Sequence, residues 1–190
     1  MKAKTKQPAD IYVYQMRVAL EGISPPIWRR IQVTSDTTLG KLHRILQIIM
    51  GWSDYHLHEF IIDNIHYGEP DPDSMYEVEK EKNVRLSKVV LGEGAKFTYI
   101  YDFGDYWRHK ILVEKILPLE PDTKYPICIK GKRACPPEDC GGASGYYKFL
   151  KVIQDPENPE HEDMLEWAGG SFDPEAFDLD EINRLLGEIR

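Results

Sequence analysis

Two aspartates and a histidine lie around a short turn in the middle of the chain, among aromatic residues. The segment 99–109 reads YIYDFGDYWRH and contains Asp102, Asp105 and His109. A carboxylate can orient an imidazole and raise its basicity, and both groups also bind divalent metals. These three residues are therefore candidate catalytic residues, for acid–base chemistry or beside a metal ion. The structural alternative is that the aspartates cap backbone amides in a turn while the aromatic side chains pack the core.

Two further histidines, His56 and His58, are two residues apart in a predicted strand, which places their side chains on one face. If that strand neighbours the strand that carries His109, the imidazoles form a cluster with Asp102 or Asp105. Neutral imidazole is the commonest protein ligand for zinc-like ions, so this cluster predicts a metal site. Packing and hydrogen bonding at the start of a strand are the alternative.

The three cysteines, Cys128, Cys135 and Cys140, all lie in one segment rich in Pro and Gly. Four residues separate Cys135 from Cys140, which is the upper limit of the usual spacing in structural zinc sites. A zinc site completed by His109 or Glu138 is one interpretation, and buried free thiols in an ordered loop are another. A disulfide between Cys135 and Cys140 and a nucleophilic Cys140 thiol near a helix N-terminus are further alternatives. With a divalent metal such as zinc as the implied cofactor, the candidate ligands are His56, His58, His109, Cys128, Cys135 and Cys140.

The elements that must position these residues follow from hydrophobic periodicity. Strands are predicted at residues 11–20, 27–33, 56–63, 97–101 and 107–117. Leu39, Leu42, Leu46 and Ile49 recur at spacings of three and four, which predicts one helix that ends at Gly51. A Gly/Pro connection joins the first two strands as a hairpin, and Asp and Gly residues favour a tight turn between the last two.

The second half of the chain is irregular and then helical. From Pro118 to Gly145 no period is sustained, and helices are predicted at 146–153, 159–167 and 178–189. The sequence therefore predicts an α+β fold with a β-grasp-like mixed sheet and one covering helix. A hairpin, an irregular Cys/Pro/Gly-rich segment and C-terminal helices follow.

The size of the chain, 190 residues, fits one domain, expected over residues 10–187 after a flexible N-terminus at 1–9. The acidic stretch at 69–83 is expected to be a surface loop. No apolar run approaches the roughly 20 residues of a membrane span, and no secretory signal opens the sequence. Three cysteines suit a reducing compartment better than a disulfide framework, so a cytoplasmic location is expected.

Charge is distributed unevenly along the chain. The net charge is −8, and the residues from Asp155 onward hold twelve acidic side chains against two arginines. An acidic protein is a poor default for tight nucleic-acid binding, which depends on neutralising phosphates with Lys and Arg. A nucleic-acid interface would need a contiguous basic patch around Arg29, Arg30 and Lys41.

Several separated motifs occur in an order that resembles the plasmid pRiA4b open-reading-frame-three-like family, also called MM3350-like. They are IWRR at 27–30, LH at 42–43, GW at 51–52, HLHEF at 56–60, YDFGD at 101–105 with Trp107 and His109, and CPPEDCGG at 135–142 with Gly145 and Tyr146. The resemblance covers about residues 10–187. It implies a shared fold and module without an established activity, and labels given to some relatives imply a mobile-element or regulatory setting.

Two functional hypotheses from different classes follow. The first is a cytosolic binding or interaction module for a protein or small molecule, with a recognition surface on the loops at 102–109 and 135–145. It predicts exposed aromatic side chains there. The second is a metal-dependent hydrolase that uses the Asp/His cluster, and it predicts that these side chains converge in one pocket. A nucleic-acid-associated protein is a third alternative, and whether the chain is an enzyme stays open.

Overall fold

The structure is a computed structural model that describes residues 11–70 and 77–189. The predicted flexible N-terminus at 1–9 lies outside the described residues, as do residues 71–76 of the predicted acidic loop. Within the described part, one eight-stranded sheet has the order β5-β4-β3-β6-β7-β1-β2-β8. All neighbouring strands are antiparallel except β4 and β5, which are parallel. The strands are β1 (Tyr12–Leu20), β2 (Trp28–Thr34), β3 (His58–Ile62), β4 (Ile65–Gly68), β5 (Val78–Lys80), β6 (Lys96–Tyr101), β7 (Trp107–Pro118) and β8 (Ile127–Lys132).

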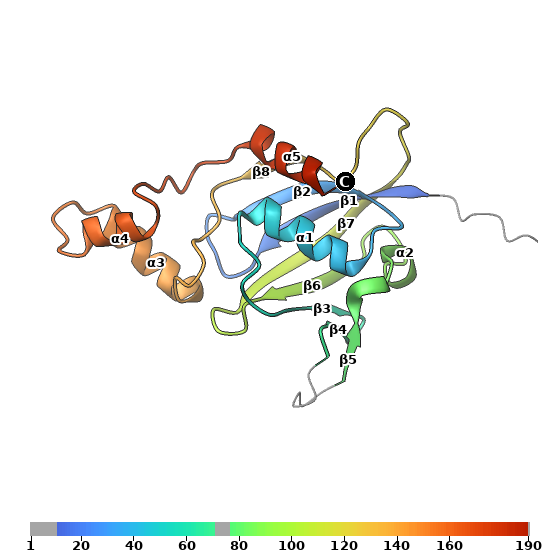
Figure 1. Cartoon of the computed structure of the whole chain (residues 1–190), viewed down its shortest axis with the longest axis horizontal. Helices are drawn as coiled ribbons and strands as arrows, with labels where there is room; N and C mark the ends of the chain where they lie inside the picture. Colours follow the sequence, from blue (N-terminus) through green and yellow to red (C-terminus); the bar gives the residue numbers. More distant parts are fainter. Residues whose placement is uncertain (1–10, 71–76, 190) are drawn as a thin grey trace, which may run out of the picture.

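Five α-helices and one 3-10 turn accompany the sheet in the described residues. They are α1 (Leu39–Met50), η1 (Glu81–Asn83), α2 (Leu86–Val89), α3 (Gly142–Ile153), α4 (His161–Trp167) and α5 (Leu179–Glu188). Helix α1 lies across one face of the sheet, α5 packs beside it over β8, and α3 and α4 extend beyond one end of the sheet (Figure 1). None of the described helices is both long and apolar enough to cross a membrane.

The core lies between α1 and the sheet. Leu39, Leu42, Leu46 and Ile49 form the predicted apolar stripe of α1, and all four are buried. Thr38 begins the helix by accepting a hydrogen bond from the Lys41 amide at 3.2 Å. On the strands, buried and exposed residues alternate, as expected of a sheet with one covered face.

The uncovered face of the sheet is polar. Arg30 on β2 forms a bidentate ion pair with Glu114 on β7, at 2.6 and 2.7 Å, and Gln15 donates to the same carboxylate at 3.0 Å. These contacts run across three neighbouring strands. They keep charged side chains on the solvent side and leave the opposite face for the core.

The predicted α+β architecture is confirmed, with the first hairpin as β1–β2, the covering helix as α1 and the second hairpin as β6–β7. Two predicted segments need correction. The segment 118–145 is not irregular throughout, because β8 pairs with β2 inside it. Gly131 lies in β8 where a side chain would overlap the Phe177 ring, so tertiary contact decides the residue there and hides the strand pattern. The acidic stretch likewise ends in β5 and η1.

Candidate metal centre

A cavity of about 820 Å³ opens between α1, the loop before β3 and the segment that contains β5 and η1. Helix α1 approaches η1 closely at Gly40, where a side-chain carbon would lie 3.3 Å from a Glu81 carboxylate oxygen. Histidines, carboxylates and cationic side chains make up most of the cavity wall. The lining residues are Thr38, Gly40, Lys41, His43, Arg44, Asp54, His56, Leu57, His58, Gly68, Glu69, Lys80, Glu81, Lys82 and Ile189.

Three of these side chains have the chemistry and spacing of a metal site. His43 on α1, Asp54 in the following loop and His58 at the start of β3 each offer one ligand atom within 4.8 Å of the others. His43 Nε2 lies 2.7 Å from Asp54 Oδ1. The two imidazoles stack with their centroids 3.5 Å apart and an interplanar angle of 3°. His58 Nε2 lies 3.0 Å from a Glu81 oxygen.

Hydrogen bonds from the core fix the orientation of this group. His43 Nδ1 lies 2.8 Å from Tyr99 Oη, which also accepts a hydrogen bond from the Gln47 side-chain amide at 2.9 Å. Gln47 Oε1 in turn accepts from the Asp54 backbone amide at 3.1 Å. The network aims His43 Nε2 at the cavity and holds Asp54 beside it. Outer contacts of this kind orient metal-binding histidines in known sites.

Burial sets the protonation state of His43. Burial, and secondarily the neighbouring His58 imidazole, lower the pKa of His43 below its ordinary value, although Asp54 acts in the opposite direction. The ring is therefore neutral at pH 7, which is the form that binds metal ions. The Asp54 side chain is 53% exposed, so this ligand faces solvent in the cavity.

Two imidazoles and one carboxylate suit a zinc-class divalent ion and leave at least one coordination position open. Catalytic zinc sites have this composition, whereas structural sites use four protein ligands. Because the two rings are parallel, one of them must tilt for a nitrogen lone pair from each ring to reach one ion.

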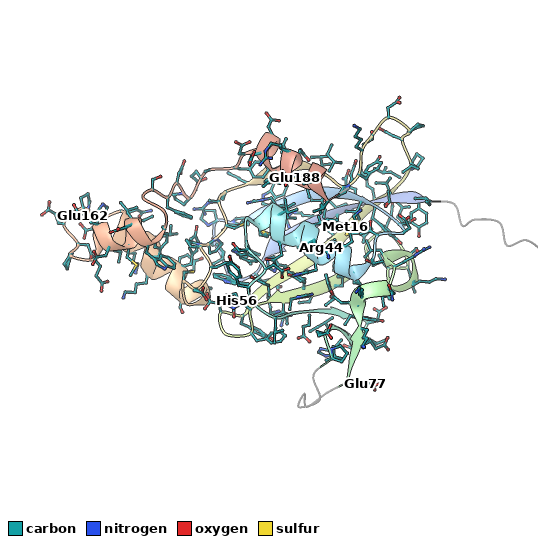
Figure 2. All side chains as sticks on the ribbon, viewed as in Figure 1. Met16, Arg44, His56, Glu77, Glu162 and Glu188 are labelled. Atoms are coloured by element: carbon teal, nitrogen blue, oxygen red, sulfur yellow. The ribbon has the colours of Figure 1, made fainter. Side chains whose placement is uncertain are left out.

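A second group of potential ligands consists of His56, which lines the cavity, and of Asp102 and Asp139, which do not. His56 Nε2 is 3.2 Å from Asp139 Oδ1 and 3.8 Å from Asp102 Oδ2. This nitrogen is closed to solvent and makes no hydrogen bond in the described part of the chain. Figure 2 shows His56 at the end of the sheet that faces α3, separate from Arg44 on α1.

The aspartates of both groups share an unusual backbone conformation. Asp54, Asp102 and Asp139 have φ angles of 60°, 58° and 59°. Residues other than glycine seldom adopt this left-handed region, although Asp and Asn do so more readily than most. Such positions are often retained at functional sites because the surrounding structure holds them there.

The predicted triad of Asp102, Asp105 and His109 does not come together as one group. Asp102 accepts hydrogen bonds from the amides of Gly104 and Asp105, at 2.9 and 3.3 Å, so one of its oxygens serves the turn. Asp105 accepts from the Gly141 amide at 3.1 Å. His109 points into the core with no exposed surface, and its Nδ1 lies 3.4 Å from the Tyr99 carbonyl. Burial lowers the pKa of His109 to about 4.

His56 and His58 belong to different groups of potential ligands. The strand β3 begins at His58, so His56 lies in the preceding loop and joins Asp102 and Asp139, while His58 joins His43. Both side chains still line the same cavity. The expected sharing of one strand face is therefore wrong, because the first two residues of the predicted strand are not paired in the sheet.

The cysteines are free, and none joins a potential metal group within the described residues. Cys128 Sγ contacts the Lys130 carbonyl at 3.6 Å, and Cys135 Sγ lies 3.2 Å from an Arg29 nitrogen. Burial raises the pKa of Cys128 to about 11 and, together with the nearby Asp105 charge, that of Cys140 to about 12. These thiols stay protonated at pH 7, which disfavours both metal binding and nucleophilic attack.

The sequence prediction missed His43 and Asp54. His43 is four residues after Leu39, so it falls on the apolar stripe of α1, and a titratable residue on a buried stripe is a usable signal. Asp54 gives no such signal, because its place depends on the left-handed turn after α1 and on contact with Gln47.

The basic residues at 29–30 do not form the patch that a nucleic-acid interface would need. Arg29 is buried and donates to the carbonyls of Ile49 and Lys132, at 2.8 and 3.0 Å. Arg30 is on the opposite face of β2 and is neutralised by Glu114. Neither guanidinium is available beside Lys41.

Known proteins that are similar to this chain support the family that its motifs resemble. The family model described as plasmid pRiA4b ORF-3-like protein matches residues 12–181. The chain belongs to this family. The uncharacterized protein y4hQ of Sinorhizobium fredii (strain NBRC 101917 / NGR234) is 35% identical over 179 residues, covering 93% of this chain and 92% of that protein. The predicted resemblance is confirmed.

A solved structure of the pRiA4b ORF-3-like family supports the fold. It is the crystal structure of the protein of unknown function MM3350 from Methanosarcina mazei Go1, which is 40% identical and superimposes with a TM-score of 0.82. The match covers 91% of this chain and 98% of that one. The names of these family members state no activity, so the function must be argued from the cavity.

Proposed function

We propose that this protein is a metal-dependent hydrolase whose active site is the cavity beside α1. The observation that supports it best is the convergence of ligand atoms from His43, Asp54 and His58 on the wall of an open cavity. These three residues would hold a zinc-class ion. Such an ion lowers the pKa of a coordinated water and polarises the bond to be cleaved.

Glu81 is placed to act as the base in this proposal. Its carboxylate lines the cavity and lies 3.0 Å from His58 Nε2, next to the ligands without belonging to the group of three. A carboxylate in this position can take a proton from attacking water and return it to the leaving group. The cavity of about 820 Å³ is in the range of small-molecule sites.

We predict that zinc-loaded protein hydrolyses at least one of three esters. They are p-nitrophenyl acetate, p-nitrophenyl phosphate and bis(p-nitrophenyl) phosphate. Glu81→Gln should lower kcat by roughly 100-fold while zinc stays bound, because the proton acceptor is lost. The measurement is the rise in absorbance at 405 nm as p-nitrophenol is released, followed over a time on the order of minutes. Dialysis against a chelator should remove the activity, and added zinc should restore it. Absence of zinc-dependent turnover with all three esters would contradict the proposal.

A recognition surface is a second candidate, favoured by exposed aromatic side chains beside the second ligand group. Tyr55 is 82% exposed, Phe103 is 47% exposed and Tyr106 is 53% exposed, with Leu57 at 63% in the same loop as Tyr55. The amide of Asp102 donates to the Leu57 carbonyl at 2.9 Å, so the two loops are joined. Large exposed apolar side chains that cluster in this way are typical of protein interfaces.

If the exposed aromatic side chains form a recognition surface, replacing them should abolish binding of a protein partner. A Tyr55→Ser/Phe103→Ser variant should lose a cross-linked protein partner that the wild-type chain retains in its native cells, while its zinc affinity stays at the wild-type value. Cross-linking with mass-spectrometric identification is the measurement. An identical set of cross-linked proteins for both forms would count against an interface here. The mobile-element or regulatory setting implied by the resemblance stays a prediction.

A further inference from the structure

Four cationic side chains line the proposed active site. Lys41 and Arg44 lie on α1, Lys80 on β5 and Lys82 on η1, and all four line the cavity. The whole chain has a net charge of −8, so four cations on one cavity wall differ from the average surface. Elements far apart in the sequence therefore bring positive charge to the lining of one cavity.

The four cations are not neutralised by neighbours. In the part of the chain that the structure describes, none of their side chains forms an ion pair or a hydrogen bond. The lining also holds three carboxylates, Asp54, Glu69 and Glu81, so its cations exceed its carboxylates by one. Asp54 contacts His43 and Glu81 contacts His58, and among the described residues neither forms an ion pair with the four cations. Positive charge in the cavity is thus available to a ligand.

We propose that the substrate of this cavity is a small phosphate monoester. This inference rests on the proposed hydrolase function. A monoester carries about two negative charges near pH 7, which match a divalent ion together with several Lys and Arg side chains. The cavity volume of about 820 Å³ accommodates a small molecule, and the four positive residues line this one cavity.

The reaction needs only water as co-substrate. The oxygen of water forms a bond to phosphorus while the bond from phosphorus to the ester oxygen breaks. One proton of the water passes through Glu81 to the departing oxygen, so the products are an alcohol and inorganic phosphate. No oxidant or reductant takes part.

The test compares p-nitrophenyl phosphate with p-nitrophenyl acetate on zinc-loaded protein. In a Lys41→Gln/Arg44→Gln variant, the ratio of kcat/KM for the phosphate to kcat/KM for the acetate should fall by roughly 10-fold or more, since charge-assisted hydrogen bonds are lost. A Lys88→Gln/Lys110→Gln variant changes the net charge equally outside the cavity lining and is the matched control. Inorganic phosphate should compete with the phosphate ester in the wild type.

The possible outcomes distinguish failure of the phosphate monoester assignment from failure of the hydrolase function on which it rests. Zinc-dependent turnover of the acetate without turnover of the phosphate would overturn the phosphate assignment and keep the hydrolase. Equal effects of the cavity variant and the control variant would also overturn it, because general charge would then explain the change. Preference for bis(p-nitrophenyl) phosphate over the monoester would assign a phosphodiester and overturn the monoester. No zinc-dependent turnover of any ester would overturn both proposals.

Discussion

Replacing His58 with asparagine is expected to lower the affinity for zinc by roughly 100-fold or more. Loss of an outer hydrogen-bond partner already costs 10- to 100-fold in known metal sites, and His58 would bind the ion directly. His43→Asn should have an effect of the same size, because the proposed site draws one nitrogen from each ring. Isothermal titration of metal-free protein with zinc at pH 7 measures both.

The matched control for these two variants is His161→Asn on α4. His161 contacts the Val152 carbonyl through Nδ1 at 3.1 Å and belongs to neither group of potential ligands. Its zinc affinity should equal that of the wild type. If the three variants bind zinc equally well, His43 and His58 do not hold the ion.

Acid is expected to destabilise the protein through His109. This imidazole has no exposed surface and its pKa in the folded state is about 4, below the value of about 6.5 in an unfolded chain. Between these two values the unfolded chain binds more protons, so stability is complete above pH 6.5 and falls as the pH approaches 4. The loss should be roughly 3 kcal/mol at pH 4 from this residue.

The measurement is urea unfolding of the wild type and His109→Gln at pH 7 and pH 4. Glutamine keeps a donor for the Tyr99 carbonyl but does not titrate, so the free energy of unfolding of the variant should fall less between the two pH values. His109→Met repeats the comparison without a buried polar group. The same pH dependence in all three proteins would show that His109 does not titrate as its burial implies.

The two predictions concern histidines that have different roles in this protein. His109 is enclosed by the core and serves its packing, with Trp52 at a centroid distance of 5.3 Å. His43 is nearly as buried, yet one of its nitrogens reaches the cavity. The difference comes from position: β7 directs His109 under α1, whereas α1 itself carries His43 to the cavity edge.

Most of the fold could be predicted because its elements have strong local patterns. The stripe of α1 and the alternation of β7 each extend over several residues, and local periodicity is then a good guide. Strand β5 is three residues long, and β8 contains Gly131 against Phe177. Short elements at sheet edges depend on pairing with distant partners, which the sequence pattern does not contain.

The site could be predicted only in part, for the same reason. His56, His58 and Asp102 were recognisable as ligand types near one another in the predicted sheet. Their division into two groups depends on where β3 begins, and a shift of two residues decides it. Asp139 reaches His56 from a loop more than eighty residues later in the chain. Such long-range contacts become visible only in the folded structure.

Anomalous diffraction at the zinc edge, from crystals of the zinc-loaded protein, decides whether the ion lies at His43, Asp54 and His58. We expect one strong anomalous peak on the cavity wall, within about 2.0–2.2 Å of His43 Nε2, a His58 nitrogen and an Asp54 oxygen. The peak should vanish in crystals of His58→Asn. A peak held instead by the cysteines or by His56, or no peak at all, would contradict a metal centre at His43, Asp54 and His58.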